Sequence, residues 1–205
     1  MSRPPVNPAR VDWSGENPGM YLKEREDGPF SALISFFRVV HSPHGRGHAV
    51  IFITDPDRPV QGAGHVNAVY TDNPDLARYL VDEFARHFGS FRPVPGLAEL
   101  PIKRAWNFRA SGDPRSRYIE LAETEDGPLS LTWSEGGEPF LVEYLPAQSA
   151  TGRHEMFSLF VACQGGSARV GSVEARGRAF PRDQFGKASS TAFLAFSETW
   201  LQPQG

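Results

Sequence analysis

The chain has 205 residues, 40% of them hydrophobic, and a formal net charge of −3. A nearly balanced charge without a Lys/Arg run argues against a nucleic-acid partner, and no apolar run approaches the roughly 20 residues of a membrane span. The single cysteine, Cys163, excludes an intramolecular disulfide. The N-terminus has no apolar secretion signal, so we expect a cytoplasmic protein without a membrane partner.

Residues 1–12 contain three prolines and few apolar side chains, which is typical of an extended or disordered arm. Trp13 starts a segment with turn-forming Gly and Pro and with apolar side chains that can close one end of a core. We find no linker and no fixed repeat after this point. The sequence therefore predicts one domain over residues 13–205, preceded by an arm over residues 1–12.

Residues 30–40 and 47–54 are apolar at both odd and even positions, as expected for two paired strands with both faces covered. A short strand at 65–71 precedes a different pattern. Asn73 and Pro74 form a helix start, apolar residues follow at four-residue spacing, and Gly89 is a stop signal. We predict one amphipathic helix over about residues 74–88.

From Ile102 onward the chain alternates short apolar runs with Gly, Pro and Asp turns, which predicts a β-meander. The expected strands are 102–110, 116–124, 128–135, 139–145, 154–163, 168–180 and 190–201. About ten strands leave edges that closure would remove. We therefore predict a mainly β fold closed into a barrel of eight to ten strands, whose order resembles the calycin or lipocalin-like barrels. A two-sheet sandwich is the alternative.

The two-residue period of these strands places some charged residues among apolar ones. Glu198 shares a parity with Phe196 and Trp200, Arg104 with Trp106 and Phe108, and Glu143 with its leucine neighbours. Inside a barrel, these three charged residues could orient a ligand or act as an acid–base pair with a stabilising cation. The expected ligand-binding side chains are Trp106, Phe108, Trp133, Tyr144, Phe196, Glu198 and Trp200. On a solvent-exposed face of the sheet, the same charged residues would only form structural ion pairs.

Two further segments contain residues that could bind a metal ion or an anion. His41, His44 and His48 lie within eight residues and could ligate a metal, but their spacing and the intervening Pro and Gly favour a flexible hairpin turn, so no metal is predicted. Residues 177–190 contain Arg178, Arg182 and Lys187, which could hold an anion. That segment lacks the spacing of a phosphate loop, and we expect it to cross the barrel mouth with Phe180 and Phe185 over the core.

Three functions remain open. The first is a protein that binds a small, mostly apolar molecule inside the barrel; the second is an isomerase, cyclase or hydratase that uses Glu198 or Glu143 with Arg104 in the same cavity. The third is a structural or interaction module with a filled core. No nucleotide or nucleophile motif is present, so we expect no cofactor, and we allow for a homodimer.

Overall fold

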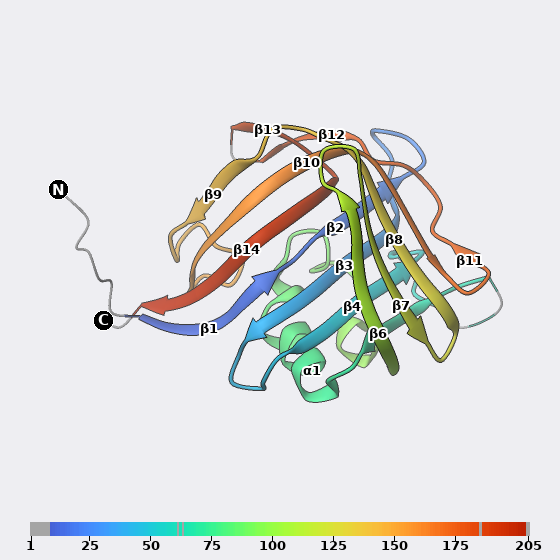
Figure 1. The fold of residues 1–205 in the computed structure, drawn as a ribbon, viewed down its shortest axis with the longest axis horizontal. Coiled ribbons are helices and arrows are strands. Elements are labelled where there is room, and N and C mark those ends of the chain that lie inside the picture. Colours follow the sequence, from blue (N-terminus) through green and yellow to red (C-terminus); the bar gives the residue numbers. More distant parts are fainter. Residues whose placement is uncertain (1–8, 61, 63, 185, 204–205) are drawn as a thin grey trace.

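In the computed structural model, which describes residues 9–60, 62, 64–184 and 186–203, the chain is mainly β and forms a closed barrel of nine strands (Figure 1). This confirms the predicted fold class. Around the barrel the strands are β14 (Ala192–Pro203), β2 (Gly19–Lys23), β3 (Phe30–His41), β4 (Gly47–Thr54), β5 (Asn67–Thr71), β6 (Ile102–Asp113), β7 (Arg117–Thr124), β8 (Gly127–Gly136) and β10 (Glu155–Val170). Pairing of β10 with β14 closes the ring.

The remaining strands extend or cover the barrel. β1 (Ala9–Glu16) pairs with both β14 and β3, β9 (Phe140–Tyr144) pairs with β10, and β11 (Val173–Glu174) forms a short end to β10. β12 (Pro181–Gln184) and β13 (Lys187–Ser190) form a separate hairpin at the top of the view in Figure 1. Residues 9–12 therefore belong to a strand, whereas residues 1–8 of the expected arm lie outside the described residues.

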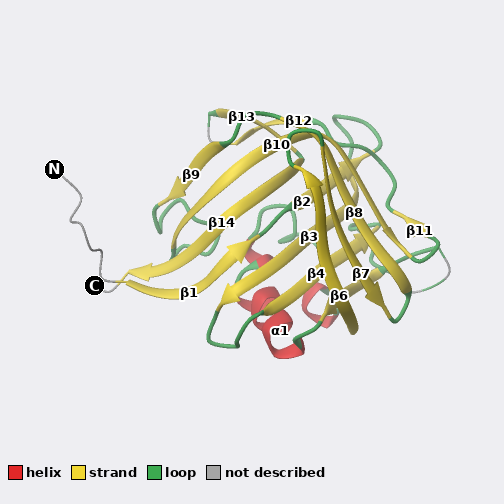
Figure 2. Ribbon diagram, in the orientation of Figure 1, coloured by secondary structure: helices red, strands yellow, loops and turns green. Residues whose placement is uncertain are grey.

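The sheet is mixed, because β5 and β6 run parallel while the other barrel neighbours are antiparallel. A parallel pair needs a crossover connection. Here the crossover contains α1 (Pro74–Glu83) and the 3₁₀ helices η1 (Ala85–His87) and η2 (Leu97–Glu99), which lie together on one side of the barrel (Figure 2). None of the described helices is long and apolar enough to cross a bilayer.

Helix α1 starts as the sequence predicts. The Asn73 side chain accepts a hydrogen bond from the Leu76 backbone N–H at 3.2 Å, which satisfies one of the free donors of the first turn. The α-helix ends at Glu83 rather than near residue 88. Phe84 leaves helical geometry and packs its buried ring edge-on against Trp13 and Trp200, with centroid distances of 5.9 and 5.3 Å.

The barrel interior is a packed hydrophobic core, which we call the interior core. All nine barrel strands contribute to it, and its largest members are buried side chains: Met20, Phe36, Phe52, Tyr70 and Trp133. The indole N–H of Trp133 donates to the Gly19 carbonyl at 3.1 Å, so even its polar atom is satisfied inside the barrel. Large side chains thus occupy the space in which the sequence led us to expect a ligand.

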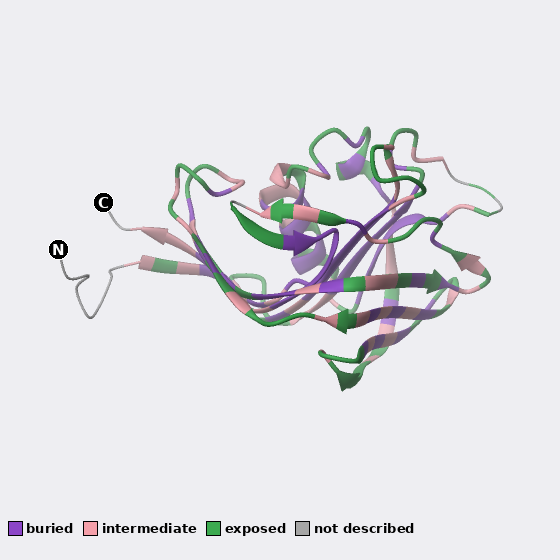
Figure 3. Ribbon diagram, turned by 90° about the horizontal axis from the view of Figure 1, so that it is seen from above, coloured by how far each residue is buried: buried purple, intermediate pink, exposed green. Residues whose placement is uncertain are grey.

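A second core, the outer core, lies between the barrel wall and the crossover. Trp13, Leu33, Phe37, Ile51 and Trp200 are among the wall residues that pack against α1 and the loop after it. Strands β3 and β4 are therefore covered on both faces, which explains their apolar residues at both parities. Along β7 and β8, buried positions alternate with more accessible ones, as the strands away from the helices show in Figure 3.

Candidate functional site

A β-bulge near the end of β14 determines where the most unusual carboxyl group lies. Leu194 and Phe196 belong to the interior core, as their shared parity predicts. Ser197 then adopts a left-handed conformation, with φ of 52°, and the pairing with β10 shifts between Phe157 and Leu159. One extra residue reverses the alternation of the strand. Glu198 and Trp200 consequently lie on the outer face, on the same side as Phe193.

On this outer face, the described residues form a cleft of about 280 Å³ between the barrel wall, the loop after α1, β9 and the β12–β13 hairpin. Its polar lining consists of Asn17, Tyr21, Ser90, Tyr144, Arg182, Gln184 and Glu198, and its apolar lining of Phe88, Ala150, Met156, Phe193 and Trp200. A small cavity with mostly apolar walls and a few converging polar groups is the usual form of a ligand site.

Glu198 is 3% exposed and belongs to the wall of this cleft. Burial raises its pKa to about 8, although hydrogen bonding with Trp200 and Ser158 acts in the opposite direction. The Trp200 indole N–H donates to Glu198 Oε1 at 2.7 Å. At neutral pH the carboxyl group is therefore mostly protonated, and it can donate a hydrogen bond or a proton.

Arg182 supplies the positive charge of the cleft. Its guanidinium carbon lies 4.9 Å from the centre of the Phe193 ring and 5.5 Å from that of Tyr21, within the range of cation–π contacts. No described carboxylate forms a salt bridge with it, and its buried Nε has no hydrogen-bond acceptor. Burial lowers the pKa of the guanidinium. The aromatic rings thus contact a cation that has no counter-ion in the part of the chain that the structure describes.

Two tyrosine residues lie near both Arg182 and Glu198. The Gln184 amide donates to Tyr144 Oη at 2.8 Å, which joins β12 to β9 across the cleft. Arg182 and Glu198 both act electrostatically on Tyr21 and Tyr144. Burial raises the pKa of Tyr21 to about 12, so this phenol remains neutral at physiological pH. Arg182 and Glu198 therefore share one enclosure without forming an ion pair.

The structure does not bring the expected ligand-binding residues together in one place. Tyr144, Glu198 and Trp200 line the cleft, whereas Trp133, Phe108 and Phe196 pack in or against the interior core. Trp106 does not share a face with Phe108, because Asn107 has a φ of 55° and forms another bulge. The Trp106 indole instead donates to Glu123 Oε2 at 2.7 Å.

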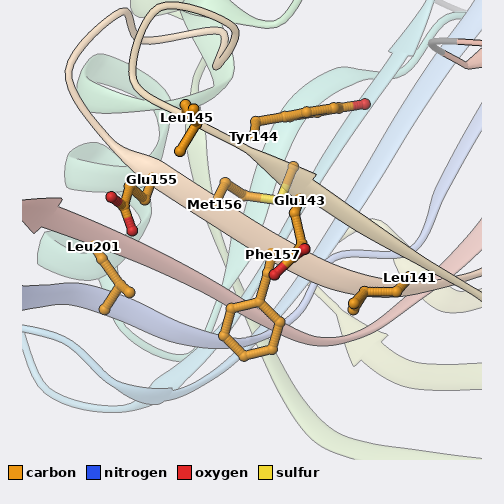
Figure 4. A pocket seen from close by; sticks show the side chains of 8 residues that line it. All are labelled: Leu141, Glu143, Tyr144, Leu145, Glu155, Met156, Phe157 and Leu201. Carbon is orange, nitrogen blue, oxygen red and sulfur yellow. The ribbon is translucent and has the colours of Figure 1, made fainter. Parts of the chain in front are cut away.

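The other two charged candidates do not meet Glu198. Arg104 is exposed on β6, where its guanidinium lies 5.7 Å from the centre of the Trp106 ring. Glu143 is exposed on β9 and lines a separate groove of about 560 Å³. Figure 4 shows Glu143 beside Phe157 in this groove, with Tyr144 pointing away from them. An arrangement of Glu198 with Arg104 or Glu143 is therefore absent from the described residues.

Arg182 lines the cleft, but the sequence indicated it only as one of three basic residues in the segment 177–190. The other two cations of that set lie elsewhere: Arg178 lies over the Phe180 ring at 4.7 Å, and Lys187 donates to the Leu141 carbonyl at 2.6 Å. Phe180 is buried, and Phe185 lies outside the described residues. Tyr21 and Gln184 had no local signal in the sequence, because only the folded barrel brings them to Arg182.

The histidine-rich turn is held by neighbouring side chains. His48 Nδ1 lies 2.7 Å from Asp72 Oδ2, and the His44 ring packs 4.5 Å from the Tyr79 ring. The Asn73 amide donates to the carbonyl of His44 at 3.0 Å. Among the described residues, no group of three or more His, Cys, Asp or Glu side chains is arranged to hold a metal ion.

Two other buried polar clusters lie away from the cleft. The Arg38 guanidinium donates to both carboxylate oxygens of Glu120, at 2.8 and 2.7 Å, and the Tyr118 hydroxyl donates to the same carboxylate. His154 Nε2 lies 2.7 Å from Asp12 Oδ2. The charged groups in each cluster have partners, so we interpret these clusters as structural contacts that connect segments of the chain.

The chain matches no family model, no curated protein and no solved structure.

Proposed function

We propose that this protein binds a small organic molecule in the cleft on the outer wall of the barrel. The observation that carries the proposal is the partly buried guanidinium of Arg182, which has no counter-ion among the described residues and faces a cavity that also contains the buried Glu198. Burying unpaired polar groups costs free energy, and a ligand would offset that cost. The expected binding residues are Tyr21, Tyr144, Arg182, Gln184 and Glu198.

This proposal moves the ligand from the barrel interior to the cleft. It is supported by the large side chains of the interior core and by the mixed lining of the cleft. A ligand with an apolar body and one polar end remains the expected chemistry, because aromatic residues and Met156 form much of the wall. A cytoplasmic location and a homodimer stay predictions.

A cleft-filling substitution tests the binding site. Ala150 is half-buried and lines the cleft, so Ala150→Trp should occupy the cavity. Leu141→Trp is the matched control, because Leu141 lines only the neighbouring groove. Native mass spectrometry of the purified proteins should detect a bound small molecule in wild type and in the control but not in Ala150→Trp. An equal ligand content in all three proteins would refute the cleft as the site.

Glu198 supports an enzyme as a second candidate function. A carboxyl group with a pKa of about 8, next to neutral tyrosines, has the properties of a general acid. In an isomerase, cyclase or hydratase it would donate a proton while Arg182 stabilised negative charge on the substrate. The test is conversion of the co-purified molecule by wild type and by Glu198→Gln. Binding by both proteins without conversion by wild type would leave only the binding function.

A further inference from the structure

The charge balance of the cleft defines the kind of ligand that it accepts. Among the described residues of its lining, Arg182 is the only cation and Glu198 the only carboxyl group. Since the Glu198 carboxyl group is mostly neutral at physiological pH, the residues that line the cleft together carry a net positive charge at this pH. An anion would be drawn to such a cavity, whereas a cation would be repelled.

The surroundings of the guanidinium further restrict which of its groups a ligand can reach. Phe193 and Tyr21 lie on one side of it, with ring centres 4.9 and 5.5 Å from its carbon and 5.4 Å from each other. Its Nε is buried and has no acceptor among the described residues, so a ligand in the cleft would be bound through the terminal nitrogens. A carboxylate can accept two parallel hydrogen bonds from one edge of a guanidinium, and this pairing is among the strongest in proteins.

Resting on the proposed function, we infer that the ligand is an organic monocarboxylate whose carboxylate group is bound by Arg182, with a second polar group of the ligand bound by the Glu198 carboxyl group. The aromatic walls hold the apolar body between these two ends. Gln184, which is bound to Tyr144 across the cleft, keeps strand β12 and hence Arg182 against the barrel wall.

Three probes of one shape test the inference. 3-Phenylpropionate is an anion, 3-phenylpropionamide is neutral and 3-phenylpropylamine is a cation at pH 7. Titration calorimetry with the ligand-free protein should show that the carboxylate binds at least about tenfold more tightly than the amide, and that the amine does not bind. In Arg182→Gln the carboxylate should lose this advantage, while the amide keeps its wild-type affinity.

Arg178→Gln is the matched control, since Arg178 also lies over an aromatic ring but does not line the cleft. It should bind all three probes like wild type. Ligand-free Arg182→Gln should melt at the wild-type temperature or above, because it removes a partly buried cation that has no anionic partner among the described residues. A clear fall in melting temperature would instead assign Arg182 a structural role and contradict the inference.

The outcomes separate this inference from the proposed function. Equal binding of the carboxylate and the amide by wild type, abolished by Ala150→Trp, would overturn the carboxylate inference and leave the cleft as a ligand site. Binding of none of the three probes, together with no small molecule in the purified protein, would overturn both. A carboxylate preference that survives in Arg182→Gln would also refute the assignment of Arg182.

Discussion

Replacing Glu198 with Gln should change how the stability of the protein depends on pH. The carboxyl pKa rises from an ordinary value of 4.5 to about 8 on folding. Between these values the native state holds one more proton than the unfolded state. The group therefore stabilises the fold fully below pH 4.5, and its contribution falls by about 1.4 kcal/mol per pH unit until pH 8.

The glutamine side chain retains a carbonyl oxygen that can accept from the Trp200 indole, as Glu198 Oε1 does at 2.7 Å. Urea denaturation of ligand-free wild type and Glu198→Gln at pH 5, 6, 7 and 8 should show the variant gaining on wild type at each step. Subtraction removes the effect of other buried groups, including His154, whose pKa burial lowers. Tyr21, Tyr144 and Arg182 also face the cleft, but they do not change charge in this range.

If the difference in unfolding free energy between wild type and Glu198→Gln were constant from pH 5 to 8, Glu198 would not be a proton-binding group of the folded state. The account of a mostly neutral carboxyl group in the cleft would then be wrong.

Two other predictions concern groups outside the cleft. Arg38→Met leaves Glu120, which is 1% exposed, without its cation. Urea denaturation should show that the free energy of unfolding falls by about 3 to 5 kcal/mol, and the double variant Arg38→Met/Glu120→Leu should largely restore it. An undiminished stability of the single variant would contradict the pairing. Burial raises the pKa of the Cys163 thiol to about 11. The native protein at pH 8 should therefore react with a thiol reagent far more slowly than urea-unfolded protein does. Equal reaction rates of the two forms would refute the burial of Cys163.

Much of the fold follows from residue patterns that act locally. Asn73 and Pro74 start the helix where predicted, and the doubly apolar runs at 30–40 and 47–54 become strands β3 and β4, covered on both faces. The parallel pairing of β5 with β6 was not apparent, because it depends on the path of the crossover. Strands β1, β2, β12 and β13 were also missed, since each contains Gly, Pro or charged residues and forms only beside an existing neighbour.

The site was less predictable than the fold, for a physical reason that Glu198 illustrates. Strict alternation places Glu198 with Phe196, inside the barrel. Ser197 and Asn107 occupy left-handed conformations in the middle of strands without being glycine, and each reverses the alternation after it. No local residue pattern marks these two bulges. Glu198, Trp200 and Tyr144 do line one cleft, but the face of the sheet on which Glu198 lies and the residues around it differ from the prediction.

The bulge at Ser197 is also relevant to the question of whether the cleft binds a ligand. A left-handed serine costs on the order of 1 kcal/mol, and a buried carboxyl group that must be protonated costs more. The partly buried guanidinium of Arg182, which has no anion beside it among the described residues, adds to both costs. A cleft whose walls served only to pack against each other would be more stable with apolar residues at positions 198 and 182. All three costs fall on groups in or directly beside one cavity. Binding of a ligand that supplies an anion to Arg182 and an acceptor to Glu198 would offset the last two, which is why their coincidence argues for function.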